Sequence, residues 1–350
     1  MNKAAASLLT LENDTSSVTV DLFGGAITDF HLKHSDINPL SFAFSKEQMP
    51  ENNKNGAPYQ GHFLCLGRWG LPSDGEIKAG IPNHGEVANI LWAVTGKNSN
   101  TLNMQTTAKL EGLYVERKIA LEQNNPVFAV TENVTNINPL GRLYNMVQHP
   151  TLAAPFLDNE TIVDCNADKG FDQAFYKNVA DNILQWPHVK DEHGNSFDLR
   201  NSSTAYDAVF SFVVRPNDEY GWVTAYSSTN QLLIGYIWKR SDYPWIHLWQ
   251  HLEKDKIKYR GIEFGTAGIH QPLKEILDTA ATLFGEKTFA YLDAGECITK
   301  KYFSFIVNTN ADFKGVETIT IADNNMLIKT ISDDPINFQL TPELFNELSK

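Results

Sequence analysis

Period-two alternation of apolar and polar residues is the feature of this 350-residue sequence that most constrains its fold. Between Leu113 and Glu122, one set of alternate positions consists of Leu, Val, Arg, Ile and Leu, and the other consists of Tyr, Glu, Lys, Ala and Glu. Successive side chains of a β-strand point to opposite faces, so this pattern indicates a strand with one buried face. A second strand is predicted from Val127 to Val134, directly after Pro126.

Further β-rich runs are spread along the chain and are separated by clusters of Gly, Pro, Asn and Asp that indicate turns. They occupy residues 17–22, 208–214, 221–226, 232–238, 301–307 and 318–321. Strands that follow one another without regular intervening helices form antiparallel sheets. We therefore expect an all-β fold, either a large sandwich or a barrel. Because no repeat, linker or shift in composition interrupts the sequence, residues 1–350 are expected to form one domain.

Helical segments are expected to be few and short. One is predicted from Pro272 to Phe284, ending at Gly285, and another from Pro342 to Leu348. The stretch from residue 45 to residue 60 is rich in Asn and Pro, so we interpret it as a surface loop.

The charge balance excludes some classes of partner. The chain has 29 Lys and Arg residues against 42 Asp and Glu residues, which gives a net charge of −13. Nucleic acids and anionic membrane surfaces are bound by clustered Lys and Arg, and the sequence has no basic run. No stretch approaches the roughly 18 apolar residues that a membrane span needs. We expect neither nucleic acid nor a membrane as a partner.

The cysteines and the first residues favour a cytoplasmic location. Cys65, Cys165 and Cys297 lie far apart and are best interpreted as reduced thiols rather than as metal ligands. The short apolar run near the start is interrupted by Glu12 and Asp14, so we expect no secretory signal.

Common nucleotide-binding and hydrolase motifs are absent from the sequence. It has no phosphate loop, no G-x-G-x-x-G and no G-x-S-x-G. His247 and His251 are four residues apart, as in zinc metalloproteases, but no Glu follows His247 and the surrounding residues indicate a strand. On a strand His247, Trp249 and His251 share one face, which suits a polar and aromatic surface better than a zinc site. No metal is expected.

Four short segments place His, Asp or Glu inside apolar strands or at their ends. They are Gly67–Gly70 with Pro82–Asn89, Leu143–Pro150, Ala205–Phe210 and Tyr259–Thr266. A carboxylate or imidazole in a buried strand costs several kcal/mol unless it is paired or faces a cavity. One such residue can be explained by a satisfied hydrogen bond or by exposure, whereas four segments together indicate a functional site.

In this order, the segments resemble the galactose mutarotase-like family, whose type member is aldose 1-epimerase. The matching positions are Arg68, His84 and Trp92, then Glu132–Asn136, His149, Asp207, Glu263 and Asp293–Glu296. The resemblance covers nearly the whole chain and depends on order and spacing more than on any single motif. It implies a large antiparallel supersandwich. The residues around His149 and Glu263 depart from the usual family sequences, which indicates a divergent branch.

The resemblance implies exchange of sugar anomers through general acid and base catalysis of ring opening. Glu263 would be the base and His149 the acid, and no cofactor would be needed. Arg68, His84 and Asp207 would bind the sugar. His247 and Trp249 would complete the binding surface, with Trp249 stacking on the C–H face of the sugar. The expected partner is a small-molecule sugar or sugar derivative, and a homodimer is left open.

Three alternatives remain at this point. A non-catalytic carbohydrate-binding β-sandwich could keep the same residues. A glycoside hydrolase or lyase could use Asp207 and Glu263 as a carboxylate pair, which needs a separation of about 5 Å or of about 6.5–9.5 Å. A phosphosugar substrate would require more Arg or Lys at the cleft, for which Lys239 and Arg240 are the only obvious pair.

Overall fold

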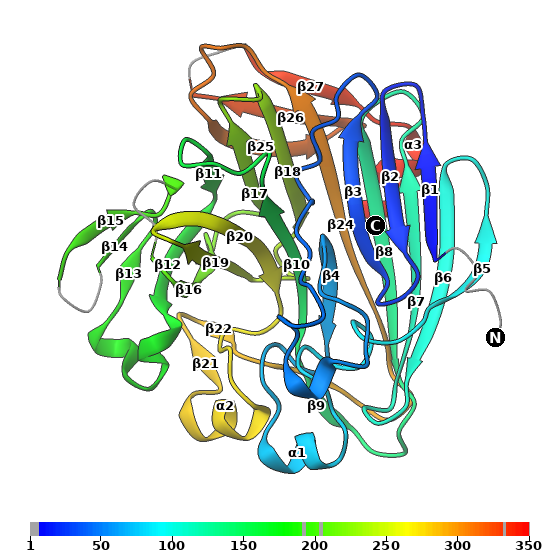
Figure 1. Cartoon of the computed structure of the whole chain (residues 1–350), viewed down its shortest axis with the longest axis vertical. Coiled ribbons are helices and arrows are strands. Elements are labelled where there is room, and N and C mark those ends of the chain that lie inside the picture. The colour runs from blue at the N-terminus through cyan, green and yellow to red at the C-terminus, as the bar shows by residue number, and fades with distance from the viewer. Residues whose placement is uncertain (1–6, 191–193, 203–205, 332–333, 350) are drawn as a thin grey trace.

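Two large antiparallel sheets organise the chain (Figure 1). The structure is a computed structural model that describes residues 7–190, 194–202, 206–331 and 334–349. Within these residues the first sheet has twelve strands, in the order β1 (Leu8–Glu12), β2 (Ser16–Asp21), β3 (Ala26–Leu32), β4 (His62–Leu66), β10 (Met146–Ala153), β20 (Lys256–Gly265), β19 (Trp245–Glu253), β16 (Ala208–Val214), β12 (Ala167–Asp172), β13 (Leu184–Gln185), β14 (His188–Lys190) and β15 (Ser196–Asp198).

The second sheet has eight strands in the same described ranges. Their order is β11 (Ile162–Cys165), β17 (Tyr220–Ser227), β18 (Leu232–Lys239), β24 (Cys297–Asn308), β8 (Val127–Asn136), β7 (Leu113–Leu121), β6 (Thr101–Ala108) and β5 (Ala93–Lys97). Every strand predicted from the alternation falls within a strand of one of these sheets or within β25 (Val316–Ala322) to within one residue. The expected all-β architecture with few short helices is confirmed.

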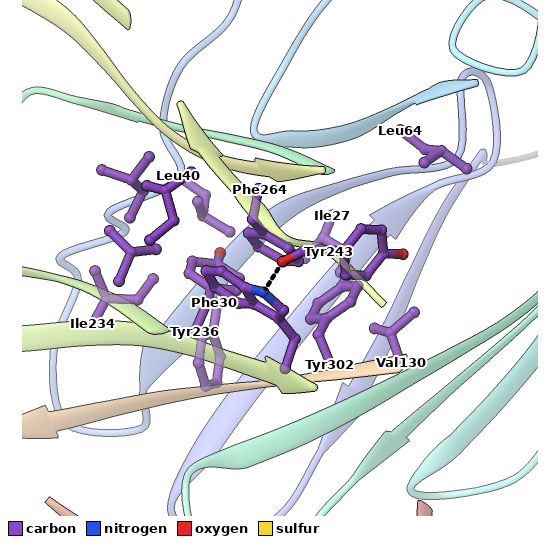
Figure 2. Close-up of a cluster of buried hydrophobic side chains, with 14 of the residues drawn as sticks. Ile27, Phe30, Leu40, Leu64, Val130, Ile234, Tyr236, Tyr243, Phe264 and Tyr302 are labelled. Carbon is purple, nitrogen blue, oxygen red and sulfur yellow. Dashed lines mark hydrogen bonds between the residues drawn. The ribbon is translucent and has the colours of Figure 1, made fainter. Parts of the chain in front are cut away.

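The two sheets share one hydrophobic core, to which both contribute alternate side chains. Figure 2 shows Phe264 of the first sheet beside Tyr236 and Tyr302 of the second. The Phe264 ring also stacks on Trp238, with ring centroids 4.1 Å apart. The sheets therefore form a sandwich, in which period-two alternation sorts each side chain to the core or to the outer face.

Strand β7 has the buried face that its sequence predicts, including Arg117. Because this guanidinium lies in the core, its charge needs a partner. Glu132 is directly opposite on β8, and Arg117 donates from Nε to Glu132 Oε1 over 2.7 Å. Gln148 Nε2 donates to the second oxygen of Glu132 over 2.5 Å. This hydrogen-bonded group ties β7 and β8 to β10 across the sandwich.

A third layer covers the outer face of the eight-stranded sheet. It consists of β25, β26 (Asn325–Thr330), β27 (Ile336–Gln339) and α3 (Pro342–Ser349). Ile319 and Phe338 of this layer, together with Phe313 just before it, pack against Trp222 and Phe305 of the sheet. The predicted C-terminal helix is therefore confirmed, and it contributes Leu344 to this contact.

The remaining elements lie near the ends of the sheets. They are α1 (Asp74–Lys78), α2 (Leu273–Thr279), the 3-10 helices η1 (Glu51–Asn53) and η2 (Gln173–Asp181), and two small pairings, β9 (Arg142–Tyr144) with β23 (Ala290–Leu292) and β21 (Thr282–Leu283) with β22 (Glu286–Lys287). In the described residues, no helix is long and apolar enough to cross a membrane.

Two local predictions need correction. The helix expected from residue 272 to residue 284 ends at Thr279, because Phe284 and Gly285 adopt positive φ angles of 54° and 87° in the turn of the β21–β22 hairpin. The loop from residue 45 to residue 60 is not only a surface excursion. It contains η1, and Met49, Asn53 and Tyr59 are buried.

Candidate active site

An open pocket lies on the outer face of the twelve-stranded sheet, over β10, β19 and β20. The space between its walls is about 580 Å³, of which part is open to solvent. The lining residues come from both sheet strands and loops. They are Phe42, Phe44, Pro50, Tyr59, Phe63, Trp69, His84, His149, Val209, Trp249, Glu263 and His270.

Strand alternation explains why polar groups of distant segments meet here. On β20, Ile262 and Phe264 point into the sandwich core, so Glu263 between them points to the outer face. On β10, the same alternation places His149 outward between two core-facing residues. The two strands are paired antiparallel, with Gln148 opposite Phe264. The pairing therefore places the carboxyl group of Glu263 and the imidazole of His149 side by side on the sheet surface that forms the floor of the pocket.

Glu263 is a buried carboxyl group with two polar neighbours. Its side chain is 1% exposed. Oε1 lies 3.3 Å from His149 Nε2, and Oε2 accepts a hydrogen bond from Trp69 Nε1 over 3.0 Å. Burial raises the pKa of Glu263 to about 8, and the Trp69 hydrogen bond opposes this rise. At neutral pH the carboxyl group therefore keeps its proton.

His149 is neutral in the same pocket, because burial lowers its pKa to about 3. Its Nδ1 lies 2.9 Å from the hydroxyl oxygen of Thr151, and that hydroxyl in turn donates to the carbonyl of His149. This arrangement favours the tautomer with the proton on Nδ1 and leaves Nε2 to accept from Glu263. The ring also stacks on Phe63, with centroids 4.3 Å apart. Glu263 and His149 thus hold one exchangeable proton between them.

His84 lines the pocket from a strained loop. It has a φ of +60°, and the next residue, Gly85, has a φ of +83°. The backbone N–H of Gly70 donates to His84 Nδ1 over 3.2 Å, so the neutral ring carries its proton on Nε2. Burial lowers the pKa of His84 well below its usual range. His84 is therefore a neutral hydrogen-bond donor at neutral pH.

Two buried contacts hold the His84 loop in this conformation. Glu86 N donates to Glu111 Oε2 over 2.8 Å, and Glu111 N donates to Glu86 Oε2 over 2.9 Å. On the other side of the loop, the Asn53 side chain donates to Asn83 O and to Asn89 Oδ1. The first contact comes from the β6–β7 turn of the second sheet and the second from η1, so both segments position His84.

Sequence reasoning missed some of the lining residues. His270 follows β20 in a loop without any periodic pattern, and its pKa is lowered to about 4 by burial. Phe42, Phe44 and Tyr59 come from the chain before and within the segment that we interpreted as a surface loop. Their aromatic character in a polar stretch was the only available signal.

Two residues that the resemblance assigned to substrate binding, Arg68 and Asp207, do not line the pocket in the described part of the chain. The Arg68 guanidinium instead bonds to Glu76 and to the carbonyl of Gly67. The Asp207 side chain is 61% exposed and accepts from His251 Nδ1 and from Leu252 N.

His247 is buried in a second layer behind the pocket. Its ring packs against Trp69 with centroids 4.0 Å apart, and its Nδ1 lies 2.8 Å from Ser211 Oγ. It is opposite Glu263 in the β19–β20 pairing. His247, predicted to belong to the binding surface, packs against Trp69 and is not part of the described lining, whereas Trp249 lines the pocket.

These positions also bear on the alternatives. A carboxylate pair of Asp207 and Glu263 finds no support, because Asp207 lies outside the pocket and is bound to the β19–β20 end of the sheet. Over the residues that the structure describes, no group of three or more His, Cys, Asp or Glu side chains is arranged to hold a metal ion.

Comparison with known proteins gives matches in structure but not in sequence. No protein-family model and no curated protein matches this chain. A galactose mutarotase related enzyme from Lactobacillus acidophilus superposes with a TM-score of 0.60 at 14% identity, covering 86% of this chain and 98% of its own. A galactose mutarotase-like protein from Lactobacillus casei superposes with a TM-score of 0.60 at 13% identity, covering 86% and 100%.

A third solved structure extends the comparison. A protein from Klebsiella pneumoniae that is provisionally named an aldose 1-epimerase superposes with a TM-score of 0.59 at 14% identity, covering 87% of this chain and 80% of its own. The chain therefore has the fold of the galactose mutarotase-like proteins, as its sequence resemblance predicted.

Proposed function

We propose that this protein exchanges the anomers of a reducing sugar by general acid and base catalysis, as an aldose 1-epimerase does. The observation that carries the proposal is the contact between Glu263 and His149 on the floor of an aromatic pocket. One carboxyl group and one imidazole that share a proton provide both partners of the required proton transfers. The fold similarity to a galactose mutarotase related enzyme and to a protein provisionally named an aldose 1-epimerase supports the same activity.

Ring opening moves two protons. Glu263 as carboxylate takes the proton from the anomeric hydroxyl, and the protonated His149 gives its proton to the ring oxygen. The bond between the anomeric carbon and the ring oxygen breaks, and the anomeric carbon becomes an aldehyde. The same two groups in their opposite states, Glu263 protonated and His149 neutral, then close the ring after the aldehyde has rotated.

The pKa values favour the second of these two states, because Glu263 keeps its proton at neutral pH and His149 is neutral. Ring opening therefore begins with transfer of this proton from Glu263 to His149 across their contact. The pair therefore carries the one proton that both half-reactions need. His84, with its proton on Nε2, is suited to donate a hydrogen bond to a sugar oxygen. Trp249 and Phe63 supply aromatic faces for the C–H groups of the ring.

The test is anomer exchange measured by proton NMR on freshly dissolved α-glucose and α-galactose, with wild type and Glu263→Gln. We expect wild type to accelerate the exchange and the variant to lose at least a hundredfold, since general acid and base groups contribute about 10²–10⁴-fold. Asp207→Asn is the matched carboxylate control, because Asp207 lies outside the pocket, and it should retain activity. Equal rates for wild type and Glu263→Gln would refute the proposal.

A further inference from the structure

The polar groups of the pocket are few, and Glu263 and His149 form its floor. Glu263, His84, His149 and His270 are the ionisable side chains that line it apart from Tyr59. The Tyr59 hydroxyl donates to the carbonyl of Asn83 over 2.7 Å and so belongs to the His84 loop. The remaining lining residues are aromatic or aliphatic, or Pro.

The walls therefore have almost no hydrogen-bonding capacity to offer a ligand. Phe42, Phe44, Phe63 and Val209 carry no polar side-chain atom, and the Trp69 N–H is already bound to Glu263. Trp249 adds one indole N–H donor to the lining. A sugar hydroxyl that is pressed against such a wall loses its water and gains no partner. A methyl group or a hydrogen atom at the same position has no hydrogen bond to water to lose, and it buries apolar surface.

Positively charged side chains are also missing from the described part of the lining. Among the described residues no Lys or Arg lines the pocket, and Arg68 is bound to Glu76. Lys46 and Lys54 line a neighbouring groove that shares Phe44, but Lys54 is paired with Glu51. The anionic group of a sugar phosphate or a sugar acid would be buried in this pocket without compensation.

From this distribution we propose that the substrate is a neutral reducing sugar in which an apolar group replaces a hydroxyl, that is, a deoxy or O-methylated aldose. This inference rests on the proposed anomer exchange. The floor groups engage the anomeric hydroxyl and the ring oxygen, which every reducing pyranose has. The aromatic walls then favour sugars that carry an apolar substituent in place of a hydroxyl elsewhere on the ring.

The test compares matched sugars in the anomer-exchange assay with wild-type protein. The pairs are galactose with 6-deoxygalactose and glucose with 3-O-methylglucose, and galactose 6-phosphate is the charged probe. We expect kcat/KM to be about tenfold higher for the apolar member of at least one pair, and the parent to be preferred in neither pair. The phosphate should be at least tenfold poorer than galactose.

Two variants connect the preference to the walls. Val209→Thr places a hydroxyl at the wall with little change in shape, and it should reduce the preference for the apolar sugar several-fold. Val94→Thr makes the same change on β5, where the side chain is 42% exposed and far from the lining, and should leave the preference unchanged. An unchanged ratio in Val209→Thr would count against wall selection.

The failures of the two proposals are distinguishable. If no sugar shows exchange that depends on Glu263, the proposed function is wrong. If exchange depends on Glu263 but the parent sugar or the phosphate is preferred, only the present inference is wrong. Calorimetric titration of Glu263→Gln with both sugar pairs measures the same preference as a ratio of Kd values, without turnover, and a ratio favouring the parent sugar would overturn the inference.

Discussion

Replacing Trp69 by Phe should shift the titration of Glu263 to higher pH. In the wild type, burial raises the pKa of Glu263 to about 8, and the Trp69 N–H opposes that rise by donating to Oε2. Phe keeps an aromatic ring against His247 but has no N–H. The carboxylate form then loses its donor, while the protonated form loses little, so the pKa must rise.

The size of the shift follows from the hydrogen bond. A bond to a charged group contributes about 1.5–3 kcal/mol, and one pKa unit corresponds to about 1.36 kcal/mol. We therefore expect the pKa of Glu263 to rise by roughly one to two units in Trp69→Phe. Because the active pair needs one proton, kcat/KM of the wild type should fall above a pH of about 8. The fall should begin at higher pH in the variant.

Two measurements check this result. The alkaline limb is measured from the pH profile of kcat/KM. The rate with Glu263→Gln at each pH is subtracted as background. Carbon NMR of protein labelled at the Glu carboxyl groups follows the same titration without substrate, so it does not depend on the proposed activity. Trp249→Phe is the control, because Trp249 lines the pocket without any bond to Glu263. An alkaline limb that moves to lower pH in Trp69→Phe, or one that moves equally in both variants, would refute the reasoning.

Three further predictions concern stability and the His84 loop. Glu132→Gln leaves the buried Arg117 guanidinium without a counter-charge and should lower the free energy of unfolding in urea by about 3–5 kcal/mol; a loss below 1 kcal/mol would contradict a buried ion pair. Burial raises the pKa of Glu111 to about 7, above its unfolded value. The wild type should therefore lose about 3 kcal/mol of stability through this group as the pH rises from 4.5 to 7. Denaturant titrations across this pH range should show that Glu111→Gln lacks the loss. In Gly85→Ala the new Cβ would lie 1.8 Å from the carbonyl oxygen of Leu66, so activity should fall more than in Gly194→Ala, whose Cβ meets no atom within 4 Å.

The sequence predicts the fold well because alternation is a local signal. Every run of alternating residues became a strand, and even Arg117 lies on the face that its position in the run indicated. The order of the strands in the sheets could not be derived in this way, since pairing joins segments that are far apart. The residues of β10 and β20 that form the pocket floor were found from polar residues in apolar strands and from the family resemblance.

The positions of Arg68 and Asp207 outside the pocket lining have a common physical cause. Arg68 and Asp207 belong to motifs of the expected type, but each has a nearer partner, Glu76 and His251, that holds it away from the pocket. Whether a charged side chain binds a ligand or a neighbour depends on loop geometry, which the sequence pattern does not contain. The aromatic wall from Phe42 to Tyr59 was missed because loops have no periodicity that would reveal a buried face.

The pairing of β10 with β20 has a consequence for the order in which this protein folds. Gln148 and Phe264 are adjacent in the sheet but are separated by a long stretch of chain, and contacts of high contact order form slowly. The pocket floor exists only once that distant pairing has closed. During refolding, the chain should therefore gain the ability to bind ligand late, after most of its β-structure has formed.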